Sequence, residues 1–215
     1  MCLELLASGE APSWRTIVPP DQAKPWPPAR RELPGDVRFE TVDAHSWEAV
    51  KGQVKELQAL CYEPARRDDL GIFGAMIEDP GAVFMLAVQG QGALGEAPLL
   101  GTAFALPLEL ESALDGPAQD PMLGRGSTVY SADVTVHPDH RGVGLGIALK
   151  EAQVRAAMLL ERPDGSPRYA FMTGRNRVGE TPGIQRINER FGAWKVSLHT
   201  GQYGEPDGAA LYYRI

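Results

Sequence analysis

The chain has 215 residues, of which 43% are hydrophobic and 23% charged, a balance typical of a globular protein with one sizeable domain or two small ones. Its formal net charge of −7 argues against general nucleic-acid binding, which requires a basic surface. No apolar run approaches the roughly eighteen residues of a membrane span, and the N-terminus lacks the basic flank of a signal peptide. We therefore expect a cytoplasmic protein that binds neither membranes nor nucleic acids.

Residues 1–35 differ in composition from the rest of the chain, because they are rich in proline and show no hydrophobic period. Each proline fixes φ and removes a backbone donor, so this segment is predicted to be an extended N-terminal arm. Trp14 and Trp26 are suited to hold it against the surface of the domain or of a partner subunit, which leaves a homodimer open. Residues 36–215 form the predicted globular domain.

From residue 36 onward the hydrophobic pattern becomes regular. The elements expected before residue 128 are a strand over 36–44, a helix over 46–63 capped by Ser46, a short helix over 69–81, strands over 82–89 and 99–110, and a loop over 111–127. The elements expected after it are a strand over 128–136, a helix from about residue 142 to the Pro163–Gly165 region, a strand over 168–174, a helix over 181–193, and strands over 194–200 and 209–215.

The order of these elements indicates how the sheet is built. Three consecutive strands favour an antiparallel meander, and the later strand-helix-strand step favours one parallel pair. We predict an α/β fold with a mixed, mostly antiparallel central sheet of about seven strands and helices on both faces.

Three glycines, Gly142, Gly144 and Gly146, stand where the long helix is expected to begin. Glycine costs about 1 kcal/mol relative to alanine inside a helix, so these positions need another reason. The first N–H groups of a helix lack partners and attract anions, and glycine lets a bulky anion approach the backbone. The stretch therefore predicts a pyrophosphate cradle, to which Arg141 either adds a cationic contact or contributes by ordering the loop.

The motifs of two other phosphate-binding classes fit poorly. The nucleoside-triphosphate pattern G-x-x-x-x-G-K-[ST] is absent, and Ile147 stands where the dinucleotide-binding pattern requires its third glycine. The stretch from Val136 to Gly146 instead resembles the acetyl-CoA-binding motif R/Q-x-x-G-x-G/A of the GNAT superfamily of N-acetyltransferases, with Arg141, Gly144 and Gly146 in the defining places. The element order over residues 36–215 also resembles that of the family.

This resemblance implies acetyl-CoA as co-substrate, no metal, and a gap between a splayed fourth and fifth strand that holds the pantetheine. The implied cofactor-binding residues are the backbone groups of Val134, Thr135 and Val136 and the loop residues Arg141, Gly142, Val143, Gly144, Leu145 and Gly146.

The chain departs from the family where many members carry a tyrosine that protonates the leaving thiolate, because Asn188 occupies that place. The segment over 172–193 is similar to a T-x-N…N-E-R-x-G variant, which implies that Asn176 and Asn188 bind cofactor or substrate through their amides. Thiolate protonation is then left to water or to another tyrosine, with Tyr130, Tyr203 and Tyr212 all open.

Asp133 is the predicted catalytic base, because a carboxylate in a half-buried strand is costly unless it is used or paired. We expect it to share a strand face with Ser131 and Thr135. Pairing with an arginine or capping a loop is an equal alternative, and Glu109 and Glu111 are the next candidates. His137 and His140 lack the further ligands of a metal site.

Two functions follow from these patterns. The first is an acyl-CoA-dependent N-acetyltransferase that moves an acetyl group from acetyl-CoA to an amine of a small molecule or peptide by direct attack. The second is a catalytically degenerate acyl-CoA-binding or interaction module. The net charge and the acidic loop over 109–120, expected at the mouth of the cleft, favour a small cationic amine as acceptor.

Overall fold

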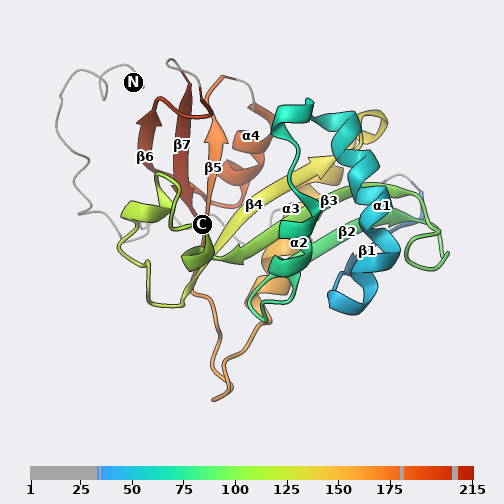
Figure 1. Ribbon diagram of the computed structural model, residues 1–215, viewed down its shortest axis with the longest axis horizontal. Coiled ribbons are helices and arrows are strands. Elements are labelled where there is room, and N and C mark those ends of the chain that lie inside the picture. Colours follow the sequence, from blue (N-terminus) through green and yellow to red (C-terminus); the bar gives the residue numbers. More distant parts are fainter. Residues whose placement is uncertain (1–32, 34, 180–181, 205–207) are drawn as a thin grey trace.

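The computed structural model describes residues 33, 35–179, 182–204 and 208–215, so the predicted arm lies almost wholly outside the described residues. The strands are β1 (Val37–Thr41), β2 (Val83–Gln89), β3 (Leu99–Pro107), β4 (Thr128–Val136), β5 (Phe171–Arg177), β6 (Trp194–Thr200) and β7 (Ala209–Arg214). They form one sheet in the order β1-β2-β3-β4-β5-β7-β6, antiparallel except for the parallel β4–β5 pair (Figure 1). The predicted mixed, mostly antiparallel sheet is confirmed.

The helices are α1 (Ala44–Cys61), α2 (Leu70–Ile77), α3 (Leu145–Met158) and α4 (Pro182–Arg190). Helices α1 and α2 lie over one face of the sheet and α3 lies over the other, so the prediction of helices on both faces is confirmed (Figure 1). Each face has its own buried apolar cluster, one including Val50 and Phe84 and the other including Met85 and Leu149. Phe84 and Met85 are successive residues of β2 and point to opposite faces of the sheet. Both are apolar because helices cover the sheet on both sides.

Helix α1 begins two residues earlier than the sequence pattern predicts. Its N-cap is Asp43, whose carboxylate accepts a hydrogen bond from the Ser46 N–H at 2.8 Å, while the Ser46 hydroxyl accepts one from the Asp43 N–H at 2.9 Å. Ser46 was expected to be the cap and is instead the third residue of the helix in a capping box. The reciprocal bonds satisfy two backbone donors that the end of the helix leaves free.

The face beneath α1 and α2 is held by four aromatic side chains. Trp47, Phe73, Phe84 and Phe104 are all buried, with ring centroids 5.0–6.3 Å apart in tilted, stacked and edge-to-face pairs. Such pairs contribute about 0.5–1.5 kcal/mol each beyond the area they bury. They fix α1 and α2 on the sheet and thereby fix the connection between them, which borders the site described below.

The parallel strands β4 and β5 part after a short paired stretch. Thr128–Ser131 pairs with Phe171–Gly174, and no pairing continues beyond Ser131 and Gly174 although both strands do. Strand β5 runs three residues later than predicted, from Phe171 to Arg177 rather than over 168–174, because its last residues pair with β7. The expected splay of the fourth and fifth strands is thus present (Figure 1).

A buried ion pair ties the long β3–β4 connection to β7. Arg214 is 2% exposed and donates to Asp120, which also accepts a hydrogen bond from the Tyr212 hydroxyl at 2.5 Å. Removing one partner of such a pair leaves an uncompensated buried charge.

We expect Asp120→Ala to lower the free energy of unfolding by about 3–5 kcal/mol, because it leaves the Arg214 guanidinium buried without an anion. Urea denaturation followed by circular dichroism measures this loss. Glu56→Ala, which removes the same charge from an exposed position of α1, is the control and should change stability by no more than about 0.5 kcal/mol. Equal stability of the two variants would contradict the role given to the ion pair.

Candidate active site

The loop before α3 explains the three glycines. Gly142 and Gly144 have φ of 82° and 96° and lie outside the helix, which begins at Leu145 rather than near residue 142 as expected. Positive φ is the region that glycine adopts without strain, so these two glycines incur no helix penalty. Gly144 is the N-cap, and no side chain caps the helix there. The first N–H groups of α3 are therefore available to an anion.

Gly146, the glycine inside α3, serves close packing. A Cβ added there would lie 3.1 Å from Cδ1 of Ile187 in α4 and 3.5 Å from a methyl carbon of Val136 in β4. The neighbouring Leu145 side chain is 3% exposed and anchors the helix in the core, while Val143 is 39% exposed at the loop tip. The motif thus holds the first turn of α3 against the end of β4.

The Arg141 side chain orders the loop, which is one of the two roles that the sequence left open. Its Nε donates to the carbonyl oxygen of Val136 at 3.1 Å, and its Nη2 lies 3.4 Å from Sγ of Cys61. These contacts tie the loop to the ends of β4 and α1. The main-chain groups of residues 142–146 therefore carry the candidate anion site.

The backbone of β4 presents unpaired groups on the side that β5 has left. The His137 N–H donates to Leu100 in β3 at 2.9 Å, and the antiparallel alternation then assigns the groups of Thr135 to β3 as well. Val134 and Val136 consequently direct their N–H and C=O groups away from β3, toward the side that β5 has left. The carbonyl oxygen of Val136 already accepts a hydrogen bond from Arg141 Nε, so the N–H of Val136 and both groups of Val134 are the ones that face the gap without a sheet partner among the described residues. Of the three predicted backbone contacts, Val134 and Val136 are placed to bind a ligand in the gap, whereas Thr135 is not.

Two asparagines lie beside the same gap. The Nδ2 atom of Asn188 in α4 donates to Oδ1 of Asn176 in β5 at 3.4 Å, and both side chains are buried, at 2% and 4% exposed. Within the described part of the chain, Oδ1 of Asn188 has no hydrogen-bond partner. Because this oxygen is shielded from solvent, the asparagine pair packs α4 against β5 and offers a ligand no exposed group here.

Asp133 lies in β4 on the side of the sheet that α1 covers. Its Oδ1 accepts hydrogen bonds from the hydroxyl of Tyr62 at 2.9 Å and from that of Thr135 at 2.8 Å, and its Oδ2 accepts one from Thr102 at 3.3 Å. No ion pair with an arginine forms among the described residues, so the structural alternative of such a pairing is wrong. Ser131 does not share this face, because its hydroxyl contacts α3.

Burial raises the pKa of Asp133 to about 6, against the lowering effect of its three hydroxyl donors, and the nearby Asp68 charge raises it further. A carboxyl group with a pKa close to neutrality suits a general base, because it is ionised at working pH and still binds a proton well.

Tyr62, the C-cap residue of α1, was not singled out by its sequence position. Its hydroxyl lies 2.6 Å from the Thr135 hydroxyl in addition to its bond with Asp133, 71 residues away. A contact over this separation leaves no periodic signal in the sequence. Tyr62 fixes the orientation of the Asp133 carboxylate.

The tyrosine at the parting of the strands is Tyr213, which was not among the candidates. A Cβ added at Gly174 would overlap its phenol oxygen and lie 3.1 Å from the Ser131 carbonyl oxygen, so the phenol lies directly over the last β4–β5 pair. Burial raises the pKa of Tyr213, so it holds its proton at neutral pH.

The three tyrosines expected as proton donors occupy other surroundings. Tyr212 donates its hydroxyl hydrogen to Asp120, Tyr130 is buried in the cluster beneath α1, and Tyr203 lies 5.4 Å and 5.2 Å from the guanidinium carbons of Arg175 and Arg177.

The two glutamates predicted as substitute bases, Glu109 and Glu111, have different surroundings. Glu109, the expected substitute base, accepts hydrogen bonds from the N–H groups of Gly124 and Gly126 at 3.1 and 2.9 Å and thus caps a turn. Glu111 is different: burial raises its pKa, the Arg175 charge lowers it, and the Asp68 charge raises it again. Because the Asp68 charge acts on both Glu111 and Asp133, we refer to these three carboxyl groups together as the acidic cluster.

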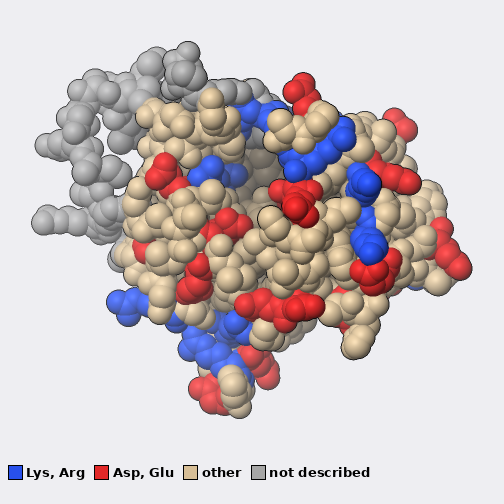
Figure 2. Space-filling model, in the orientation of Figure 1, with Lys and Arg blue, Asp and Glu red and all other residues tan. Residues whose placement is uncertain are grey.

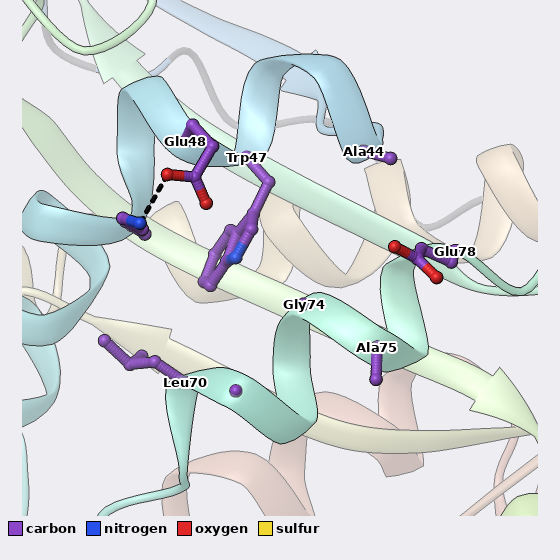
Figure 3. A pocket seen from close by; sticks show the side chains of 9 residues that line it. Ala44, Trp47, Glu48, Leu70, Gly74, Ala75 and Glu78 are labelled. Atoms are coloured by element: carbon purple, nitrogen blue, oxygen red, sulfur yellow. Dashed lines mark hydrogen bonds and ion pairs between the residues drawn. The ribbon is translucent and has the colours of Figure 1, made fainter.

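The surface is hollowed between α1 and β5, above β4, with charged side chains at the rim (Figure 2). A separate groove between α1 and α2 is lined by Trp47, Leu70 and the small residues Gly71, Gly74 and Ala75, together with Glu78 and the Lys51–Glu48 ion pair (Figure 3). That groove contains none of the candidate site residues on β4, β5 or the glycine loop. No group of three or more metal-ligating side chains occurs among residues 33, 35–179, 182–204 and 208–215. Over the same ranges, no helix is long and apolar enough to cross a membrane.

Neither a family model nor a curated protein matches the sequence. Solved structures do match the fold. NAA60 of Arabidopsis thaliana in complex with acetyl-CoA is 18% identical, with 82% of this chain and 97% of that chain covered and a TM-score of 0.55. A putative acetyltransferase of the GNAT family from Desulfovibrio desulfuricans is 17% identical (83% and 98% covered, TM-score 0.54). The ribosomal-protein-S18-alanine N-acetyltransferase of Escherichia coli is 11% identical (83% and 92% covered, TM-score 0.55).

These matches cover 82–83% of this chain and at least 92% of each matched chain. Because the identities are only 11–18%, the matches show a shared fold and nothing finer. The chain therefore has the fold of the GNAT acetyltransferases.

Proposed function

We propose that this protein is an acyl-CoA-dependent N-acetyltransferase, which moves an acetyl group from acetyl-CoA to the amine of a small molecule by direct attack. The observation that carries the proposal is the Asp133 carboxylate, held by three hydroxyl donors beside the parting of β4 and β5, with a pKa of about 6. The degenerate module, our second hypothesis, gives no reason to keep a half-buried, unpaired carboxylate at this place.

The residues present fit acetyl-CoA. The N–H groups at the start of α3 and the glycine loop before it suit the pyrophosphate, and the backbone groups of Val134 together with the N–H of Val136 suit the amides of the pantetheine. Bound acetyl-CoA supplies the activated acetyl group as a thioester.

The chain's own groups divide the chemistry between them. Asp133 accepts a proton from the ammonium form of the acceptor, directly or through water, and leaves a neutral amine that is able to attack. The free N–H of Val134 is placed to donate to an oxygen on which negative charge develops. Tyr213 holds a proton on its phenol oxygen where the strands part, and it is the tyrosine best placed to give one up.

The acceptor class we propose is a small cationic amine. The support is the acidic cluster of Asp68, Glu111 and Asp133, since the Asp68 charge raises the pKa of both other groups and a cation would relieve that repulsion. A panel of polyamines, amino acids, aminoglycosides and peptides, assayed for thiol release from acetyl-CoA, tests both proposals. Thiol release with neutral or acidic acceptors alone would contradict the acceptor class, and none with any acceptor would favour the degenerate module.

Asp133→Asn should lower kcat about 10²–10⁴-fold, because it keeps the shape of the side chain and removes the base. Acetyl-CoA affinity, measured by calorimetry, should stay the same, since the cradle lies elsewhere. Glu109→Gln is the matched control and should leave kcat unchanged, because Glu109 caps a turn. A fully active Asp133→Asn variant would show that another group takes the proton.

The pH profile of kcat/KM should show an acidic limb near pH 6, with the rate rising as pH increases. The sign follows from the role of a base, which works only when ionised, and from the pKa of about 6 of Asp133. Steady-state kinetics between pH 5 and pH 8 measure the limb, which should be missing in Asp133→Asn. An identical limb in that variant would assign the ionisation to another group.

Gly144→Val should abolish acetyl-CoA binding, because a branched side chain at the N-cap would stand against the phosphates and strain a residue with φ of 96°. Gly165→Val is the control, since Gly165 has φ of 78° and open space around it in the α3–β5 connection. That variant carries a similar backbone strain and should bind normally in calorimetry. Equal affinity of the two variants would contradict the cradle.

A further inference from the structure

Strand β4 contains one residue more than β3 does at the point where Asp133 is presented. Asp133 pairs with Phe104, whereas Ser131 pairs with Ala105, so Ala132 between them has no partner and forms a β-bulge. An extra residue in one strand shifts the alternation of side chains beyond it from one face of the sheet to the other.

The contacts on either side of Ala132 show this shift. Ser131 directs its hydroxyl toward α3, and Asp133 directs its carboxylate toward Tyr62 at the end of α1, on the opposite side of the sheet. In an unbroken strand these two residues would share a face, as the sequence pattern led us to expect. The bulge is therefore what brings Asp133 into the acidic cluster.

One turn of α3 holds both residues that flank the bulge. Lys150 Nζ donates to Ser131 Oγ at 2.7 Å and to Gln153 Oε1 at 3.0 Å, and Ser131 Oγ donates to Gln153 Oε1 at 2.9 Å. Gln153 Nε2 in turn donates to the carbonyl oxygen of Asp133 at 3.4 Å. These hydrogen bonds can all form at the same time, because each uses a different donor hydrogen. The Lys150–Gln153 pair thus ties β4 before and after Ala132.

Burying the polar side chains of this network costs more free energy than apolar packing between α3 and β4 would. Lys150 and Gln153 are fully buried, and Lys150 forms no ion pair with any described residue. Burial lowers the pKa of Lys150 to about 7, which reflects the cost of keeping its charged form. An apolar side chain of the same length would pack at this position without that cost. We therefore attribute the role of Lys150 to its hydrogen bonds with Ser131 and Gln153.

We propose that Lys150 and Gln153 are positioning residues of the transfer site, which hold the β4 bulge at Ala132 and thereby direct the Asp133 carboxylate into the acceptor cleft. The consequence for catalysis rests on the proposed function, whereas the geometric consequence for Asp133 does not. Neither residue needs to touch the acceptor or acetyl-CoA, because the network lies between α3 and the sheet.

The test uses the full chain with Lys150→Met, which keeps the length of the side chain and removes its donors. The carboxyl carbon of Asp133, assigned by its absence in Asp133→Asn, is titrated by ¹³C NMR without any ligand. We expect its pKa to fall from about 6 toward the ordinary value of about 3.9, because a released bulge exposes the carboxylate to water. With an amine that the panel identifies, kcat should fall about 100-fold, as expected for a misplaced base, while calorimetry finds acetyl-CoA affinity unchanged.

Leu149→Ala is the matched control, because Leu149 is the neighbouring fully buried residue of α3 and its apolar side chain forms no hydrogen bond to the residues that flank the bulge. It should lower Tm at least as much as Lys150→Met and leave the Asp133 pKa near its wild-type value. Ser131→Ala, which removes the acceptor on β4, provides a second route if Lys150→Met does not fold, and it should lower the Asp133 pKa in the same direction.

Wild-type titration of Asp133 in either folded variant of the network, or an equal fall in Leu149→Ala, would overturn the positioning role. The outcome is separable from that of the proposed function. A lowered Asp133 pKa in a protein that releases no thiol with any amine would support the positioning of Asp133 and refute acetyl transfer.

Discussion

The site depends on one interruption of regular β structure, at the point where β4 leaves β5. Beyond Ser131 and Gly174 the parallel pair no longer exchanges hydrogen bonds, and the bulge at Ala132 lies immediately after it. Backbone donors and acceptors that a complete sheet would use internally are then free for a ligand. The same few residues decide which side chains face the cleft. Parting and bulge together give an inner strand backbone groups that no neighbouring strand uses, with a carboxylate beside them.

Ionisable groups are buried on both sides of this edge, and different contacts stabilise their charged forms. Arg214 and Asp120 neutralise each other, so their pair stabilises the connection that leads into β4. Asp133 is supported by hydroxyl groups alone, and Lys150 by a hydroxyl and an amide oxygen. Hydrogen bonds without a counter-ion leave the pKa shifted toward neutrality, because burial disfavours the charged form. In a buried ion pair each group stabilises the charged form of the other. A buried group that has hydrogen bonds but no counter-ion can still exchange a proton near neutral pH.

The glycine loop adds the binding side of the site, and the asparagine pair forms its far wall. Gly142 and Gly144 adopt positive φ and bring bare backbone to the start of α3, while Gly146 lets α3, α4 and β4 approach closely. Because α4 is held against α3 in this way, Asn188 is buried beside Asn176 at the far wall of the gap. One short motif therefore sets both the anion site and the distance between the walls.

The sequence alone determined the element order, the sheet class and the glycine loop, since these rest on local periodicity, turn chemistry and a motif within a few consecutive residues. It also singled out Asp133 as a candidate base, which stays a prediction. It misplaced the start of α1 and of α3 by two or three residues, because a cap is chosen by hydrogen bonds that Ser46 and Asp43 both offer. Only the tertiary structure decided the face that Asp133 occupies and the partners Tyr62, Tyr213 and Lys150. Those depend on a register shift between two strands and on contacts between residues far apart in the chain, for which the order of amino acids along one strand carries no period.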